Sequence, residues 1–108
     1  MNSLFENDLV RTLKVIGEDS NYQKKHIANL LGENCDNVDE ILLEYDDYKY
    51  LKQNYNDCVN NLFTDLENIL DEIDNLGLHS FSDLNDDVWN KARNIANEIL
   101  KIVTKATH

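Results

Sequence analysis

Residues 38–76 read VDEILLEYDDYKYLKQNYNDCVNNLFTDLENILDEIDNL, a stretch without glycine or proline that decides the fold. Apolar and aromatic side chains recur along it in steps of three or four residues, which is the spacing that lines up one face of an α-helix. This apolar stripe consists of Val38, Ile41, Tyr45, Tyr48, Leu51, Tyr55, Cys58, Leu62, Leu66, Ile69, Ile73 and Leu76. Because aspartate and glutamate fill many positions in between, the stretch predicts helix with one apolar and one strongly acidic face.

A single helix over this stretch would be about 58 Å long at a rise of 1.5 Å per residue. That is longer than a domain of this size, so two arrangements are open. Either the helix breaks near 46–48 or 54–56 and folds back, or it stays whole and packs on a second subunit. We favour the break, and Gly77 ends the stretch in either case.

The composition points to one helical domain. The chain has 108 residues and an apolar fraction of 42%, which is enough for a single core and excludes a disordered chain. Three glycines and no proline favour long helices over short strands. We therefore expect an all-α fold, a compact bundle of four or five helices over residues 1–108. A homodimer through the long central or the final helix remains an open alternative.

Two shorter helices are expected before this stretch. Ser3 and Glu6 have the spacing of a capping box, and Ser20 and Gln23 repeat it. The first helix should end at Gly17, and its buried face should contain Phe5, Leu9, Leu13 and Ile16. The second, about residues 21–31, should end at Gly32 and bury Ile27, Leu30 and Leu31. The helix after it has Asn34, Asp36 and Asn37 as candidate caps, with Asp39 and Glu40 in its first turn.

A final helix is expected near the end of the chain. Asn85 should cap it, with Asp86 and Asp87 in its first turn. Its predicted stripe is Val88, Ala92, Ile95, Ile99, Ile102 and Ala106, flanked by Trp89, Ala96 and Val103. In the connection before it, Leu78, Phe81 and Leu84 are expected to reach the core.

The net charge of −11 is concentrated in the middle of the chain. Residues 26–90 carry sixteen acidic residues against only Lys49 and Lys52. A field of this sign repels nucleic acid and anionic membrane, and it attracts basic partners. We therefore expect a basic protein partner and contact with neither nucleic acid nor a membrane.

The sequence also indicates a location. Residues 1–7 lack the basic and apolar parts of a signal peptide, and no apolar run approaches the length of a membrane span. Cys35 and Cys58 form no CxxC pattern. We expect two buried free thiols in a reducing compartment, with one disulfide between them as the alternative. The interpretation is a cytoplasmic protein.

Residues 23–42, QKKHIANLLGENCDNVDEIL, resemble the helix-turn-helix of DNA-binding transcriptional regulators. Ala28 stands where that motif has a small residue, Gly32 at the turn, and Val38 and Ile41 at apolar positions of the second helix. The resemblance implies a dimeric DNA-binding regulator, which is the second functional hypothesis. Its implied DNA-contacting residues are Lys24, Lys25 and Asn37. The second helix would present carboxylates, whereas lysine and arginine supply most of the non-specific affinity for DNA.

No residue pattern indicates catalysis, a cofactor or a metal. The three histidines lack the spacing of a zinc site, and phosphate-binding and nucleophile motifs are missing from the sequence. Asp83, Asn85 and Asp87 imitate the start of a calcium loop, but Val88 stands where that loop needs glycine. We therefore expect a protein that is not an enzyme and that uses no cofactor and no metal.

The first functional hypothesis is a small acidic inhibitor. It would bind a basic, nucleic-acid-handling partner by electrostatic or nucleic-acid-like mimicry, as immunity and anti-defence proteins do. The candidate contact residues are Glu40, Glu44, Asp46, Asp47, Tyr50 and Asp57. Tyr50 falls off the apolar stripe and is expected to face solvent, while the glutamates and Asp47 form a row at helical spacing. A plain adaptor bundle is the third hypothesis.

Overall fold

The computed structural model describes the backbone of residues 3–32 and 38–106, and the side chains of residues 8–32, 38–53 and 55–103. The elements are α1 (Ser3–Gly17), α2 (Ser20–Leu31), α3 (Asp39–Tyr48), the 3₁₀-helix η1 (Lys49–Asn54), α4 (Asp57–Leu76), the 3₁₀-helix η2 (Phe81–Asn85) and α5 (Asp87–Ala106). The predicted all-α bundle of four or five helices is confirmed. In this part of the chain, every helix is too short or too polar to cross a bilayer.

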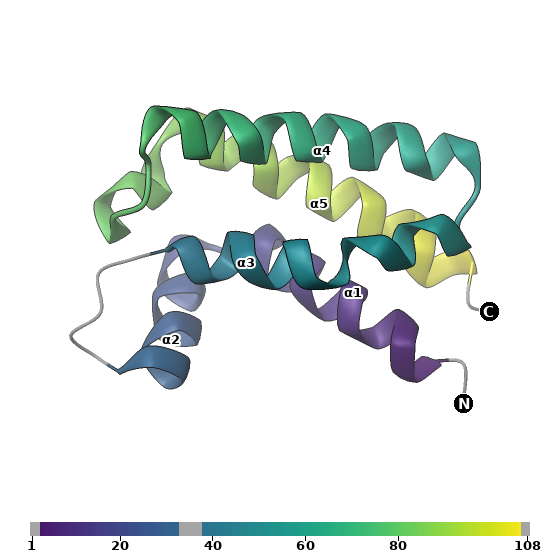
Figure 1. Ribbon diagram of the computed structural model, residues 1–108, viewed down its shortest axis with the longest axis horizontal. Helices are drawn as coiled ribbons and strands as arrows, with labels where there is room; N and C mark the ends of the chain where they lie inside the picture. The colour runs from purple at the N-terminus through teal and green to yellow at the C-terminus, as the bar shows by residue number, and fades with distance from the viewer. Residues whose placement is uncertain (1–2, 33–37, 107–108) are drawn as a thin grey trace.

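The stretch 38–76 is broken and folds back on itself, as predicted. The α-helix α3 ends at Tyr48, η1 continues it, and α4 begins after Asn56, whose side chain accepts a hydrogen bond from the Val59 N–H at 3.1 Å. An unbroken helix of about 58 Å would be longer than the 39 Å that this folded-back molecule measures in its longest dimension. The result is a hairpin in which α3 and α4 run alongside each other in opposite directions (Figure 1).

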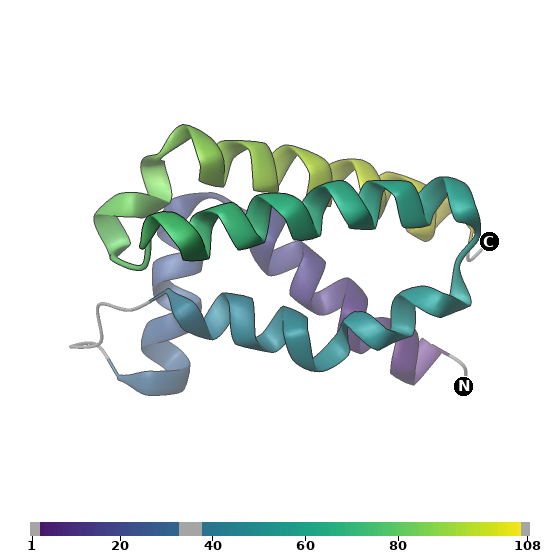
Figure 2. The same cartoon turned by 45° about the horizontal axis from the view of Figure 1, so that its top comes forward.

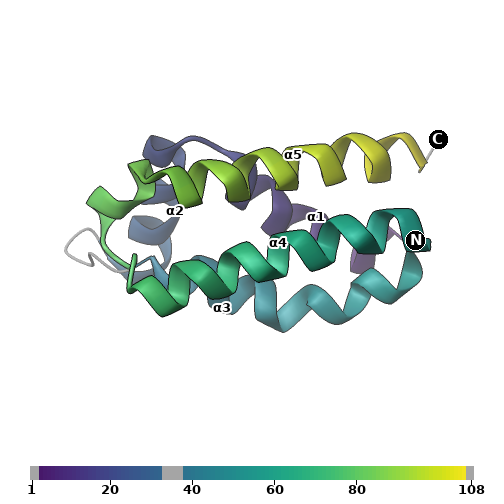
Figure 3. The ribbon, with the colours of Figure 1, turned by 90° about the horizontal axis from the view of Figure 1, so that it is seen from above.

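The core lies between α1, the hairpin and α5. Helices α4 and α5 run side by side (Figure 3), and α1 crosses obliquely to pack on α5 and α3 (Figure 2). Helix α2 lies across one end, beside α1 and η2. The largest fully buried side chains are Trp89, Phe63, Leu9, Leu13, Ile16, Ile27, Ile41, Leu66, Ile73, Leu84, Ile99 and Gln23.

The buried face of α4 differs from the predicted stripe. It consists of Val59, Phe63, Leu66, Leu70 and Ile73. Leu62 and Ile69 are half-buried and pack against the core. Cys58 and Leu76 are exposed, so the burial predicted for these two residues was wrong. The face is turned because α4 packs mainly on α5, which periodicity alone does not reveal. Cys35 lies outside the described residues.

The face of α5 is turned in the same way. Its buried residues are Trp89, Ala92, Ala96, Ile99 and Val103. Ile102 is exposed, and Val88 and Ile95 only border the core. Ala92 and Ala96 lie one helical turn apart, and their small side chains let α1 and α4 pack closely against α5. The side chain of Ala106 lies outside the described residues.

The start of α5 and the connection before it also differ in detail. Asn85 is the last residue of η2, and the Asp86 carboxylate accepts a hydrogen bond from the Val88 N–H at 3.0 Å. Asp86 therefore caps the helix in place of Asn85. Leu84 is fully buried and Phe81 packs against the core, as predicted.

The second predicted capping box was wrong. Asp19 caps α2 by accepting a hydrogen bond from the Tyr22 N–H at 2.8 Å. Gln23 is fully buried instead, and its Nε2 donates to the carbonyl oxygens of Val15 and Ile16, both at 3.0 Å. The end of α1 leaves carbonyl groups without helical partners, and this amide satisfies two of them.

The outer face of α2 is more exposed than predicted. Ile27 is buried, whereas Leu30 and Leu31 are exposed, because only one stripe of this short end helix reaches the core. Gly32 ends α2 with φ +100°. The side chains of Ser3, Phe5 and Glu6, and the candidate caps Asn34, Asp36 and Asn37, lie outside the described residues.

Candidate functional site

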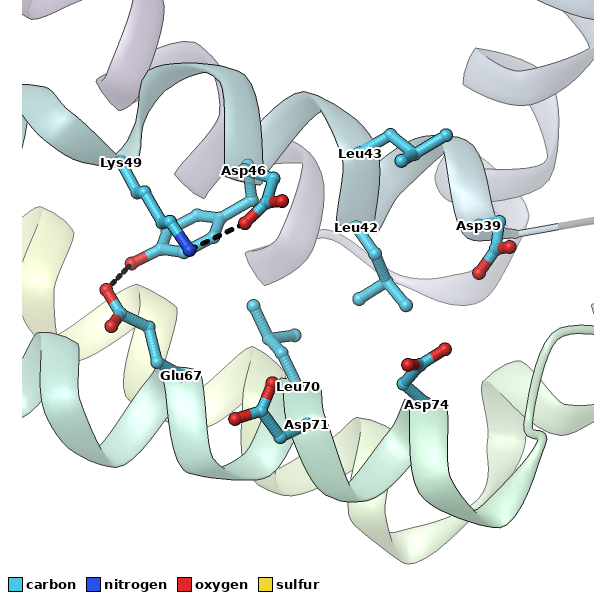
Figure 4. A pocket seen from close by; sticks show the side chains of 10 residues that line it. Asp39, Leu42, Leu43, Asp46, Lys49, Glu67, Leu70, Asp71 and Asp74 are labelled. Atoms are coloured by element: carbon cyan, nitrogen blue, oxygen red, sulfur yellow. Dashed lines mark hydrogen bonds and ion pairs between the residues drawn. The ribbon is translucent and has the colours of Figure 1, made fainter.

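A groove of about 260 Å³ lies between α3 and α4. It is lined by Asp39, Leu42, Leu43, Tyr45, Asp46, Lys49, Glu67, Leu70, Asp71 and Asp74, which we call the acidic groove. Five of these side chains are carboxylates and one is an ammonium. Figure 4 shows Leu42 and Leu70 between the carboxylates of the two helices, with Leu43 beside Leu42 on α3. The groove therefore combines concentrated negative charge with an apolar surface.

Helical spacing places these carboxylates. Asp39 and Asp46 are seven residues apart on α3, and Glu67, Asp71 and Asp74 stand at i, i+4 and i+7 on α4. Positions at these intervals lie on one face of a helix, at steps of about 6 and 10 Å along the axis. Because the helices are antiparallel, Asp39 lies opposite Asp74, and Asp46 lies toward the Glu67 end (Figure 4).

A partly buried hydrogen-bonded cluster closes one end of the acidic groove. The Tyr45 hydroxyl donates to Glu67 Oε2 at 2.7 Å, and Lys52 Nζ donates to both Glu67 oxygens at 2.9 and 2.6 Å. Burial raises the pKa of Tyr45 strongly, and the hydrogen bond to the Glu67 carboxylate adds to the rise. The negative charge of Glu67 is thus paired with Lys52, and the contacts of Glu67 with Lys52 and Tyr45 hold the two arms of the hairpin together.

This pKa shift predicts a loss of stability at high pH. The folded protein keeps the Tyr45 proton, whereas the unfolded chain releases it above pH ~10. The stability that the neutral phenol contributes is present below that pH and falls as the pH rises, by about 1.4 kcal/mol per pH unit. Tyr45→Phe should flatten this slope in urea unfolding from pH ~8 to ~11. An equally steep loss in both proteins would contradict the assignment.

The middle of the acidic groove is open to solvent. Asp46 Oδ1 lies 2.7 Å from Lys49 Nζ, and these side chains are 64% and 45% exposed. The hydrogen bond to Asp46 raises the pKa of Lys49. Such exposed ion pairs contribute only about 0–1 kcal/mol, so a cation from a partner can replace Lys49. Asp71 is exposed and forms no ion pair within the described part of the chain.

The other end of the acidic groove meets the turn after α4. His79 Nδ1 lies 2.7 Å from Asp39 Oδ1, and His79 Nε2 lies 3.3 Å from Asp74 Oδ1. One ligand atom from each of these three residues lies within 4.8 Å of the other two. Imidazole and carboxylate groups at this separation are a candidate metal centre. No spacing of a metal motif joins these residues in the sequence, because they come from three different segments.

The structure brings only Asp46 of the six predicted contact residues into the acidic groove. Glu40, Glu44 and Asp47 lie one position further along α3 than groove residues, so they are turned by about 100° around its axis. Glu44 faces α2, where its Oε1 lies 2.7 Å from His26 Nε2.

The remaining predicted contact residues are exposed but lie outside the groove lining. Tyr50 in η1 faces solvent, as predicted. Asp57 is in the first turn of α4, at the opposite end of that helix from Asp74. Asp47 is also exposed. The lining of the acidic groove therefore includes none of these three residues.

The helix-turn-helix resemblance stays a prediction. Lys24 is half-buried and Lys25 is exposed on α2, while Asn37 and the rest of 33–37 lie outside the described residues. No protein-family model, curated protein or solved structure matches this chain.

Several groove residues were missed from the sequence. The spacing of Glu67, Asp71 and Asp74 was visible, but so was that of many other acidic residues. The row of Glu67, Asp71 and Asp74 differs from the other acidic rows because the hairpin turn at residues 55–56 brings it opposite Asp39. A search for acidic rows on both arms of a predicted helical hairpin would have found it.

Proposed function

We propose that this protein is a small inhibitor that binds a basic, nucleic-acid-handling protein and occludes its nucleic-acid-binding surface. Nucleases, toxins and defence enzymes have such surfaces, and immunity and anti-defence proteins act in this way. The observation that carries the proposal is the acidic groove, in which two rows of carboxylates face each other across a helical hairpin.

The electrostatics favour a cationic partner. A groove lined by one sign of charge concentrates the field and speeds association with the opposite charge. Asp71 is exposed, and Asp46 is held only by an exposed ion pair, so both can accept lysine or arginine from a partner. The net charge of −11 extends the attraction beyond the groove. The partner surface should therefore be rich in basic side chains.

The leucines of the acidic groove add an apolar contact to the electrostatic attraction. Leu43 is 55% exposed and Leu42 is half-buried beside it. Interfaces derive much of their affinity from a few apolar contacts that are desolvated within a polar rim. The leucines flanked by carboxylates have this arrangement. A basic side chain with a long aliphatic stem can bind both.

The resemblance to nucleic acid lies in charge spacing on a stiff scaffold. The α4 carboxylates are repeated at about 6 and 10 Å along the helix axis. A nucleic-acid-binding site offers lysine and arginine side chains to a regular row of phosphates. Because Tyr45, Glu67 and Lys52 fasten the hairpin, the rows are held in place before binding. Pre-organised groups lose less conformational entropy on association.

The proposal is tested by capture from a lysate of the host cell, followed by identification of the retained protein. The unmodified chain should retain a basic nucleic-acid-binding protein at about 50 mM salt and release it at about 500 mM. The groove variant Asp46→Asn with Asp71→Asn should bind that protein at least about tenfold more weakly.

A matched control has the same change in charge. Asp47→Asn with Asp65→Asn also removes one carboxylate from α3 and one from α4, both exposed and outside the acidic groove. It should weaken binding about threefold or less, through the long-range field alone. An equal loss in both double variants would exclude the groove as the contact surface. Failure to retain any basic protein would overturn the proposal.

A further inference from the structure

His79 lies in the turn beside the end of the acidic groove, with a carboxylate oxygen near each ring nitrogen. Its Nδ1 lies 2.7 Å from Asp39 Oδ1 and its Nε2 lies 3.3 Å from Asp74 Oδ1. We propose that Asp39, Asp74 and His79 bind one divalent transition-metal ion of the zinc or cobalt class. This inference does not depend on the proposed inhibitor function.

The contact between His79 and Asp39 is unlike an ordinary hydrogen bond. The Nδ1 atom is buried and has no hydrogen-bond partner among the described residues, although a carboxylate oxygen lies only 2.7 Å away. A distance this short without the alignment of a hydrogen bond means that the two atoms do not point at each other. An ion placed beside both atoms could take the Nδ1 lone pair and the Asp39 oxygen as ligands. Asp74 supplies the third atom within 4.8 Å.

The backbone fixes the positions of all three residues. Gly77 adopts a left-handed conformation at the end of α4, and the Leu78 N–H donates to the Ile73 carbonyl at 3.1 Å. The Val38 N–H then donates to the His79 carbonyl at 2.7 Å, which ties the start of α3 to this turn. Asp39 follows directly in the chain. Only side-chain rotation is needed to adjust the ligands, and such pre-organisation favours metal binding.

The donor atoms select the class of ion. One imidazole nitrogen and two carboxylate oxygens suit zinc and its neighbours, whereas calcium and magnesium prefer oxygen ligands alone. Three protein ligands leave a position for water or for a side chain of a partner. Asp74 is 67% exposed, so an ion can enter from solvent. A bound ion would join α3, the end of α4 and the turn, and should raise the Tm.

The test is isothermal titration calorimetry with zinc chloride on the full chain. Cys35→Ser and Cys58→Ser are introduced first, because thiolates bind zinc tightly elsewhere on a chain. One ion should bind per chain, and bound cobalt should give visible absorption bands. His79→Ala and Asp74→Asn should each weaken binding about tenfold or more. Asp74 is an exposed helical position, so that variant should remain folded, which circular dichroism checks.

His26→Ala is the matched control. His26 Nε2 also lies 2.7 Å from a carboxylate oxygen, that of Glu44. Within the described residues, His26 pairs with this one carboxylate, whereas His79 lies near two. Zinc affinity and the metal-dependent rise in Tm should be unchanged in this variant. The absence of saturable binding, or an equal loss in the His26 and His79 variants, would overturn the proposed site. Survival of binding in Asp74→Asn would do the same.

Discussion

Replacing Trp89 by alanine is expected to lower the free energy of unfolding by about 3–5 kcal/mol. Trp89 is fully buried and is among the largest side chains in the core between α1, α4 and α5. Its Nε1 also donates to the Leu78 carbonyl at 3.2 Å, which anchors the turn that carries His79. The substitution removes the ring and leaves a cavity beneath that turn. Urea unfolding followed by circular dichroism measures the loss, because the variant has no tryptophan fluorescence.

The variant Trp89→Phe separates packing from the hydrogen bond. It keeps an aromatic ring in the core but leaves the Leu78 carbonyl without its donor. We expect a loss of about 1–2 kcal/mol, clearly smaller than for alanine. A loss below about 1 kcal/mol for Trp89→Ala would show that the core does not close over this residue as described.

Replacing Gln23 by alanine should cost about 2–4 kcal/mol, although glutamine is a polar residue. The side chain is fully buried and donates to two carbonyl groups at the end of α1. Its Oε1 accepts a hydrogen bond from Arg93 Nη2 at 2.9 Å, and burial lowers the pKa of Arg93. Removing the amide leaves these buried groups without that partner. The free energy of unfolding at neutral pH is the measurement.

Lys25→Ala is the matched control on α2, because Lys25 is exposed two residues further along. It should change the stability by about 0.5 kcal/mol or less. Combining Gln23→Ala with Arg93→Ala should cost less than the two separate losses added together, since both remove the same interaction. Additive losses would contradict the coupling between α2 and α5.

The sequence predicted the helices better than their contacts. Helix positions followed from periodicity, and the break in 38–76 was favoured over a whole helix packed on a second subunit, because one helix would be longer than a domain of this size. The buried faces of α4 and α5 differ from the predicted apolar stripes, because each helix packs on several neighbours that local spacing does not specify. Gln23 was misassigned for the same reason. Its capping-box spacing was real, but the carbonyl groups of Val15 and Ile16 at the end of α1 compete for its side chain.

The candidate site was predicted in character and not in detail. Acidity and helicity indicated an acidic docking surface on the central stretch, and Asp46 lies in the acidic groove. The other groove carboxylates depend on the register between α3 and α4, which the hairpin turn sets. The cluster of Asp39, Asp74 and His79 depends on that register too, so no sequence motif could reveal it.

The acidic groove is proposed to occupy the nucleic-acid-binding surface of a basic partner. The most direct measurement is competition for the captured partner between this protein and a labelled DNA or RNA duplex, by fluorescence anisotropy. We predict that the protein displaces the duplex completely and that Asp46→Asn with Asp71→Asn displaces it at least about tenfold less well. A complex in which the partner holds both the protein and the duplex at undiminished affinity would contradict the claim.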